Sequence, residues 1–160
     1  MIQKVGFGGG CHWCTEAVFN QIPGVSQVDQ GWIKSDSPKH SFSEAVIVHY
    51  SDEIVSLEFL VKVHLATHSS TSSHSMRIKY RSAIYFFTKN DEIILGQLLK
   101  QLIEKEQKAY ITQILPFSDF KLNKEEYLDY FGKNPNVPFC QTYIVPKLKL
   151  LRNNFDIGHN

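Results

Sequence analysis

The sequence predicts an α+β fold: a two-layer sandwich with a ferredoxin-like (split βαβ) core and an irregular, partly helical C-terminal extension. Strand-like and helix-like patterns alternate over about the first ninety residues in the order strand, helix, strand, strand, helix, strand, which is that of the split βαβ arrangement. The 160 residues contain no internal repeat and no linker-like stretch. We therefore expect one domain over residues 1–160.

The first predicted elements form a strand, a turn and a helix. Residues 2–7 form a short apolar strand that runs into a triple glycine at residues 8–10. Glycine allows backbone angles closed to other residues, so the chain can turn sharply there. Apolar residues then recur at helical spacing over residues 11–22, and a Pro-Gly pair ends this helix.

The remaining elements follow from the same patterns. We expect strands at 25–33, 44–50 and 80–87, a possible strand at 111–115, and helices at 56–68 and 91–107. We expect a turn at 35–39, a polar, serine-rich loop at 69–75, a short helix near 124–131, an irregular stretch at 134–138 and a basic helix after Pro146.

Composition excludes several classes of protein. The 42% of hydrophobic residues can form a core at this length without disulfides. The chain has 17 Lys and Arg and 16 Asp and Glu, so it lacks the excess of basic residues that is typical of nucleic-acid binders. There is no apolar run of about 20 residues and no secretion signal, so we expect a soluble, cytoplasmic protein with no membrane or nucleic-acid partner. Three cysteines, an odd number, indicate reactive or metal-binding thiols rather than a disulfide framework.

Cys11 begins the first predicted helix directly after the glycine turn. Free backbone N–H groups and the helix dipole favour an anion there, so we expect a reactive thiolate. Cys14 lies three residues further on. The alternatives are a buried inert pair, a thioredoxin-like Cys-x-x-Cys motif, and a metal site that includes Cys140 and a histidine. A second conceivable metal site is a histidine group at positions 64, 68 and 74, but carboxylates are missing around it, and we expect no metal and no cofactor.

The segment at residues 9–19, Gly-Gly-Cys-His-Trp-Cys-Thr-Glu-Ala-Val-Phe, resembles the active-site segment of the A-class peptide methionine sulfoxide reductases. That family usually reads Gly-Cys-Phe-Trp-(Cys or Gly)-x-Glu. Further matches follow in order: Pro-Gly-Val at 23–25, Gly-Trp at 31–32, Glu-Ala-Val at 44–46, His64, Tyr-Arg-Ser-Ala-Ile-Tyr at 80–85, Lys-Asn-Pro at 133–135 and Pro-Phe-Cys at 138–140. The resemblance covers nearly the whole chain.

The resemblance implies a thiol reductase of methionine S-sulfoxide, free or in proteins. Cys11 would attack the sulfoxide sulfur and become a sulfenic acid, Glu44 would protonate the oxygen, and Tyr80 would hydrogen-bond it. Trp13 and Trp32 would make the surroundings apolar, which keeps a carboxylic acid protonated.

Three departures from the family fall at this site. His12 replaces the usual phenylalanine of the substrate-methyl pocket, so we expect weaker substrate affinity. Ser75 replaces an aspartate that supports the site. The stretch between Trp32 and Glu44 is about ten residues shorter than usual, and the missing loop normally carries a tyrosine. A weakly active homologue that serves as a thiol redox sensor or a sulfoxide-binding module is therefore the alternative function.

Recycling needs a second thiol. The resemblance favours Cys140 as the resolving cysteine, with Cys14 as the other candidate, because family recycling cysteines lie in comparable C-terminal segments. Attack on the sulfenic acid would form a disulfide, which thioredoxin or a similar dithiol would reduce. We expect the protein to act as a monomer.

Overall fold

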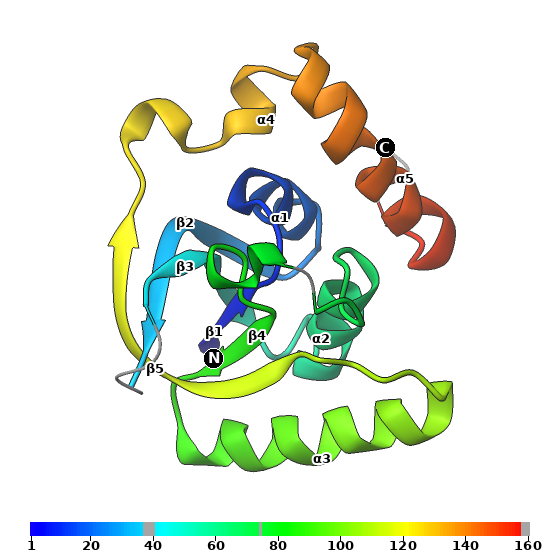
Figure 1. Cartoon of the computed structure of the whole chain (residues 1–160). Coiled ribbons are helices and arrows are strands. Elements are labelled where there is room, and N and C mark those ends of the chain that lie inside the picture. Colours follow the sequence, from blue (N-terminus) through cyan, green and yellow to red (C-terminus); the bar gives the residue numbers. More distant parts are fainter. Residues whose placement is uncertain (37–40, 74, 158–160) are drawn as a thin grey trace.

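The computed structural model describes residues 1–36, 41–73 and 75–157. Within these residues five strands form a closed barrel in the order β1-β3-β2-β5-β4, and β4 pairs with β1 (Figure 1). The strands are β1 (Ile2–Gly8), β2 (Val25–Ser35), β3 (Ser43–Ser51), β4 (Ala83–Phe86) and β5 (Gln113–Leu122). The predictions of strands at residues 2–7, 25–33 and 44–50 are confirmed. The predicted turn at 35–39 falls partly on residues 37–39, which lie outside the described residues.

Helices surround this barrel. The α-helices are α1 (His12–Asn20), α2 (Leu57–Ala66), α3 (Lys89–Glu106), α4 (Tyr130–Lys133) and α5 (Val145–Asn154), with the 3-10 helices η1 (Ser75–Ile78) and η2 (Glu125–Tyr127) and the π-helix η3 (Cys140–Ile144). Ser56 and Thr88 cap α2 and α3 through their side chains, each accepting a hydrogen bond at 3.1 Å from a backbone N–H three residues on. Among the described helices, none has the length and apolar character that crossing a membrane requires.

The prediction of a ferredoxin-like two-layer sandwich is wrong. The neighbours β4-β1-β3-β2 follow the order of a split βαβ core, but β5 pairs antiparallel with β2 and parallel with β4 and so closes the sheet into a barrel. An open sheet would leave the outer edges of β2 and β4 unpaired. The sequence suggested only a short strand at residues 111–115, because Pro116 interrupts the apolar run and proline is unusual inside a strand.

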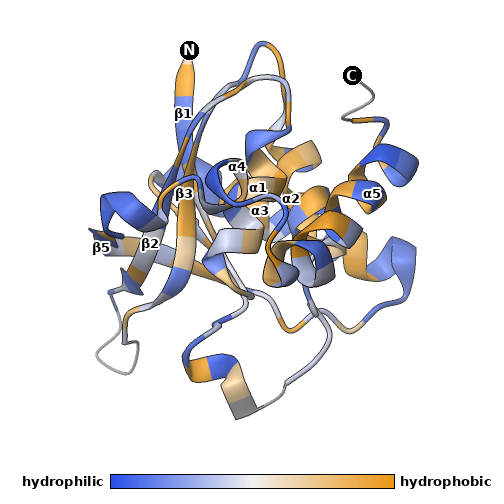
Figure 2. Cartoon of the chain, turned by 90° about the horizontal axis from the view of Figure 1, so that it is seen from above, coloured by the Kyte–Doolittle hydropathy of each residue, from blue (hydrophilic) through white to orange (hydrophobic). Residues whose placement is uncertain are grey.

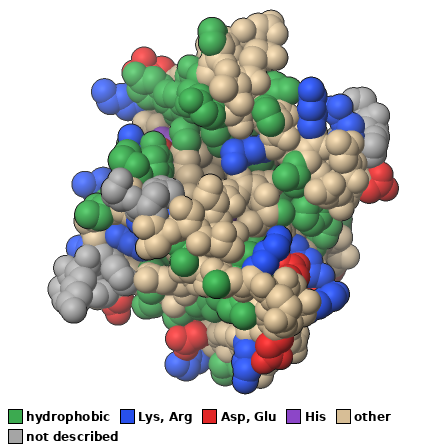
Figure 3. All heavy atoms as spheres, turned by 45° about the vertical axis from the view of Figure 1, so that its right-hand side comes forward, with side chains coloured by type: hydrophobic (Ala, Val, Ile, Leu, Met, Phe, Trp, Pro, Cys, Tyr) green, Lys and Arg blue, Asp and Glu red, His purple; other side chains and the backbone are tan. Residues whose placement is uncertain are grey.

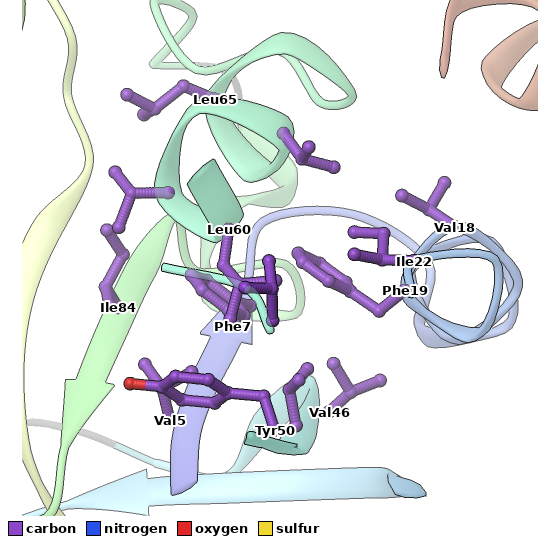
Figure 4. Close-up of a cluster of buried hydrophobic side chains, with 14 of the residues drawn as sticks. Val5, Phe7, Val18, Phe19, Ile22, Val46, Tyr50, Leu60, Leu65 and Ile84 are labelled. Atoms are coloured by element: carbon purple, nitrogen blue, oxygen red, sulfur yellow. The ribbon is translucent and has the colours of Figure 1, made fainter. Parts of the chain in front are cut away.

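The main hydrophobic core lies between the barrel and helices α1, α2 and α3. Figure 4 shows Phe7 of β1, Phe19 of α1 and Leu60 of α2 together in this core, and the Phe7 ring stacks on Phe19 with centroids 4.7 Å apart. Hydrophobic residues concentrate where the helices meet the barrel, and hydrophilic residues lie toward the periphery (Figure 2). This packing fixes α1, and with it the cysteine that precedes it, against β1.

Residues on the opposite face of the strands fill the barrel. They are Ile33, Ala45, Ile47, Ala83 and Tyr85. The interior is tight: a Cβ atom on Gly6 would lie 2.9 Å from Ile33 Cδ1 and 2.9 Å from Tyr85 Cβ. The barrel is therefore a packed scaffold, and its functional side chains lie at its end.

The chain after β5 runs around α1. The segment at 123–157 passes through η2, α4 and η3 into α5 along one side of α1 (Figure 1). The short helix predicted near 124–131 is divided into η2 and α4, and the predicted basic helix is α5, with Pro146 in its first turn. The segment at 123–157 covers the thiol end of α1.

Lys and Arg side chains are scattered over the face in Figure 3 and have Asp and Glu side chains beside them along its lower edge.

Candidate active site

Cys11 lies at the N-cap of α1, directly after the glycine turn. Gly9 has a φ of 147°, and a Cβ atom there would collide with the ring of His68, so the turn needs glycine. The Cys11 side chain is half-buried and forms no disulfide. A hydrogen bond from the Cys14 thiol lowers the pKa of Cys11, burial opposes this, and the backbone N–H groups of Trp13 and Cys14 lower it further. The site therefore favours a thiolate at Cys11.

The other two cysteines lie beside Cys11. Cys14 and Cys140 are buried in one apolar cluster with Ala17 and Ile144, and Cys11 packs against this cluster. The pKa of Cys14 is raised by its hydrogen bond to Cys11 and by burial, and the pKa of Cys140 is raised by burial and by the charge of Cys11. Three thiols therefore gather at the start of α1, and Cys11 is the one whose pKa is lowered.

Glu44 is the buried carboxyl group next to this thiol. It lies near the start of β3 opposite Trp32 of β2, and it is 6% exposed. Its Oε1 atom accepts a hydrogen bond of 3.2 Å from the backbone N–H of His12, and its Oε2 atom lies 3.5 Å from Lys79 Nζ. The charge of Glu44 raises the pKa of Cys11, so the two groups interact electrostatically.

Tyr80 and Ser75 lie on the segment that carries Lys79. Ser75 begins η1, and Tyr80 follows it, with its backbone N–H donating to Met76 O at 2.9 Å. Lys79 Nζ lies 5.1 Å from the centre of the Tyr80 ring, and a hydrogen bond with the Tyr80 side chain raises the pKa of Lys79. Lys79 thus connects Tyr80 to Glu44, a role that the sequence did not reveal.

Aromatic side chains form one wall of the site. Trp13 stacks on Tyr130 of α4, with centroids 3.9 Å apart and ring planes 10° apart. The His12 ring meets the ring of Trp32 edge-on at 5.1 Å. An open groove of about 450 Å³ runs past His12, Trp13 and Trp32 toward Leu122 and Tyr127. The side chains expected to bind substrate therefore line one continuous groove, with Ser75 at the start of the neighbouring η1.

A small polar cavity lies on the other side of the thiols. It has a volume of about 30 Å³ and is lined by Cys11, Cys14, His64, His68, Lys147 and their neighbours. The Lys147 ammonium group donates to Thr67 O, and burial lowers its pKa while the Cys14 and Cys11 thiols oppose this. Lys147 comes from α5, so no local pattern around the cysteines predicted this charge.

The metal alternatives gain no support from the geometry. Among the residues that the structure describes, there is no group of three or more His, Cys, Asp or Glu side chains that could hold a metal ion. His64 Nε2 instead lies 2.8 Å from Gly8 O, and His68 Nε2 lies 2.8 Å from Ser82 Oγ. His74 lies outside the described residues.

A thiolate with two further thiols beside it is an arrangement of thiol-dependent oxidoreductases. The sequence profile of the peptide methionine sulfoxide reductase family matches residues 3–157. The peptide methionine sulfoxide reductase MsrA of Psychrobacter sp. (strain PRwf-1) is 31% identical over 96% of this chain and 97% of its own length. The chain therefore belongs to the peptide methionine sulfoxide reductase family, in its A class.

Two solved structures share this fold. Reduced Mxr1 from Saccharomyces cerevisiae superposes with a TM-score of 0.76 at 22% identity, over 89% of this chain and 91% of that one. Mxr1 in complex with Trx2 superposes with a TM-score of 0.63 at 18% identity, over 81% and 84%. These matches agree with the closed barrel and not with the ferredoxin-like sandwich.

Proposed function

We propose that this chain reduces methionine S-sulfoxide, free or in proteins, to methionine, with Cys11 as the nucleophile and Glu44 as the acid. The observation that carries this proposal is the meeting of Cys11, whose pKa is lowered, with a buried carboxyl group beside an aromatic groove. The sulfoxide methyl group packs near Trp13 and Trp32, and Tyr80 and Lys79 face the oxygen. His12 and the segment starting at Ser75 complete the binding surface.

The reaction transfers one oxygen atom. Cys11 ionises, and its proton passes to Glu44. The thiolate then attacks the substrate sulfur, and the sulfoxide oxygen takes the proton from Glu44. The hydroxyl formed in this way passes from the substrate sulfur to the Cys11 sulfur. The new bond between the two sulfur atoms breaks with its electron pair going to the substrate sulfur, methionine leaves, and Cys11 is left as a sulfenic acid. The Cys11 sulfur loses as many electrons as the methionine sulfur gains, so the transfer needs no other oxidant or reductant.

A second thiol then removes the oxygen as water. Cys140 attacks the sulfur of the sulfenic acid and forms a disulfide with Cys11, and Cys14 is the alternative partner. Support comes from the cluster in which all three side chains pack. Thioredoxin or a similar dithiol reduces the disulfide, as suggested by the complex of the structurally similar Mxr1 with Trx2.

The same features suggest where and how the protein works. Free thiols at a redox site suit a reducing compartment such as the cytoplasm. One chain supplies every residue of the proposed site, so we infer that a monomer is active.

The test is methionine formation from the S-sulfoxide with dithiothreitol. We expect activity in the unaltered protein, background activity in Cys11→Ser, and a loss of about a hundredfold or more in Glu44→Gln, because a positioned acid contributes that much. The R epimer serves as the control substrate. Background activity in the unaltered protein would remove the enzyme and favour the redox sensor or sulfoxide-binding module.

A further inference from the structure

His12 connects the first turn of α1 to β2. Its Nδ1 atom lies 2.7 Å from the carbonyl oxygen of Gly31, and a carbonyl only accepts hydrogen bonds. Nδ1 therefore carries a hydrogen and donates it. The ring is 5% exposed and is held against Trp32. Nε2 is thus the nitrogen of this ring that gains or loses a proton.

Nε2 faces the buried carboxyl group of Glu44. It lies 3.4 Å from Oε1, and both side chains are shielded from solvent. With no proton between them, the nitrogen lone pair would face a carboxylate oxygen in a buried site, which is unfavourable. With one proton, either the Glu44 hydroxyl donates to Nε2 or Nε2–H donates to the carboxylate. The geometry therefore favours a pair that holds one proton.

We propose that His12 and Glu44 share one proton, and that His12 is a positioning residue that keeps this proton available to the sulfoxide oxygen. This rests on the proposed role of Glu44 as the acid. The one proton that the pair holds is the proton that the Cys11 thiol gives up when it ionises, and the pair gives this proton to the oxygen during attack. The phenylalanine usual at this position in the family has no proton to share, so the pair belongs to this chain's own departure from the motif.

Other charges around the pair set the pH at which it loses its proton. Burial lowers the pKa of His12, the hydrogen bond to Gly31 and the charge of Glu44 oppose this, and the charge of Lys79 lowers it further. Lys79 Nζ lies 3.5 Å from Glu44 Oε2. The Cys11 thiolate acts in the opposite direction, because an anion favours a protonated neighbour. Lys121 and Lys124, from the end of β5 and the residues after it, line the same groove as His12.

The first test is the pH dependence of a single turnover. In His12→Phe and His12→Asn the proton rests on Glu44 alone, so we expect the alkaline limb to move to lower pH by about one unit. At a pH above the limb, the rate then falls about tenfold relative to the unaltered protein, and below it the rate changes by less than about twofold. His12→Asn keeps a hydrogen-bond donor for the carbonyl oxygen of Gly31. A shift seen in both variants therefore comes from the loss of the shared proton and not from the loss of this hydrogen bond.

A second pair of the same kind supplies the control. His49 Nε2 of β3 lies 2.7 Å from Asp29 Oδ2 of β2, and His49 is not part of the site. His49→Phe is expected to leave the pH profile unchanged. An alkaline limb in His12→Phe and His12→Asn that coincides with that of the unaltered protein would overturn the proposal.

The second test does not depend on activity. In ¹⁵N spectra of the histidine rings, we expect Nδ1 of His12 to stay protonated at all pH values. We expect the pH at which the Nε2 signal changes to fall by about one unit or more in Glu44→Gln, with the His49 signals as reference. An unchanged His12 titration in Glu44→Gln refutes the pair. Absence of reductase activity refutes the proposed function, and the spectra still decide on the pair.

Discussion

Cys11 differs from the other two cysteines in exposure and in hydrogen bonding. Cys11 is half-buried and its pKa is lowered, whereas Cys14 and Cys140 are buried with raised pKa values. The thiolate is the reactive form. We therefore expect a brief treatment with limiting iodoacetamide near neutral pH to label Cys11 at least about tenfold faster than either partner. Peptide mapping by mass spectrometry measures the three rates.

The pH dependence of this labelling has a defined sign. Because the pKa of Cys11 is lowered, its labelling rate reaches its plateau at a lower pH than that of an ordinary thiol. Cys14→Ala removes the side chain that donates a hydrogen bond to Cys11, so in this variant the labelling curve is expected to move to higher pH. Faster labelling of Cys140 than of Cys11 in the unaltered protein would contradict the assignment of the nucleophile.

The sulfenic acid on Cys11 is expected to react with one particular thiol, that of Cys140. After one turnover without reductant, we expect a Cys11–Cys140 disulfide, because Cys140 lies in the cluster against which Cys11 packs. Peptide mapping of protein treated with substrate detects it. Cys140→Ser is expected to recycle with thioredoxin at less than about a tenth of the normal rate. Recycling of this variant at the full rate would assign the resolving role to Cys14.

The sequence predicted most of the residues that meet at the site, because motif residues carry their chemistry with them. His12 and Glu44 are joined by a hydrogen bond from the His12 backbone N–H, and Cys11 directly precedes His12 at the start of α1. Lys79 and Lys147 were missed for physical reasons. Lys79 follows η1 and lies near Glu44 only because the folded chain brings this segment to β3. Lys147 belongs to α5 and lines the same cavity as Cys11 and Cys14. A lysine on a polar surface and a lysine facing a buried thiol look alike in sequence.

At the scale of elements, Glu16 fastens the C-terminal segment onto α1. Its two carboxylate oxygens accept hydrogen bonds from the Gln30 side chain at 2.9 Å, from the backbone N–H of Asp129 at 3.0 Å and from that of Tyr130 at 3.3 Å. Gln30 in turn donates to Tyr127 O at 2.9 Å. Glu16 therefore holds the start of α4 against α1 directly, and it holds η2 through Gln30.

We expect Glu16→Ala to loosen this segment, because the buried N–H groups lose their acceptor. A loss of about 2 to 3 kcal/mol in unfolding free energy is the size expected for such groups. Faster hydrogen exchange confined to residues 123–157 and faster alkylation of Cys140 are the measurements. Glu58→Ala, at a mostly exposed ion pair of α2, is the matched control and should change neither. Uniformly faster exchange over the barrel would contradict the local role of Glu16.

Helices α1, α2, α3 and α5 and the first three strands were predictable, and the closure of the barrel was not. Apolar periodicity and caps such as Ser56 and Thr88 are local signals. The pairing of β5 with both β2 and β4 depends on edges that are far apart in sequence. A Cβ atom on Gly31 would collide with the carbonyl oxygen of Lys121, so β5 approaches β2 closely there. Gly31 is needed for this contact, but nothing in the sequence shows that β5 is the strand that approaches it.

At the scale of the whole molecule, the buried His64 and the half-buried His68 connect pH to stability. Burial lowers the pKa of His64 well below its ordinary value and lowers the pKa of His68 to about 4. Both rings lie between the glycine turn, α2 and β4, where His68 also donates to or accepts from Ser82 Oγ. They are neutral in the folded protein, whereas the unfolded chain binds protons at these residues below about pH 6.5.

This difference fixes the sign of the pH dependence. The unfolded state binds more protons than the folded state between about pH 6.5 and 4, so the unfolding free energy falls as the pH falls through this window. His68 alone accounts for up to about 3 kcal/mol, the free-energy equivalent of its pKa shift. Urea unfolding at a series of pH values measures this, and His68→Gln is expected to reduce the slope by about one proton. The more exposed His49 serves as the control in His49→Gln, which should keep the slope. A slope in His68→Gln equal to that of the unaltered protein would show that the neutral, half-buried His68 ring does not contribute to acid unfolding.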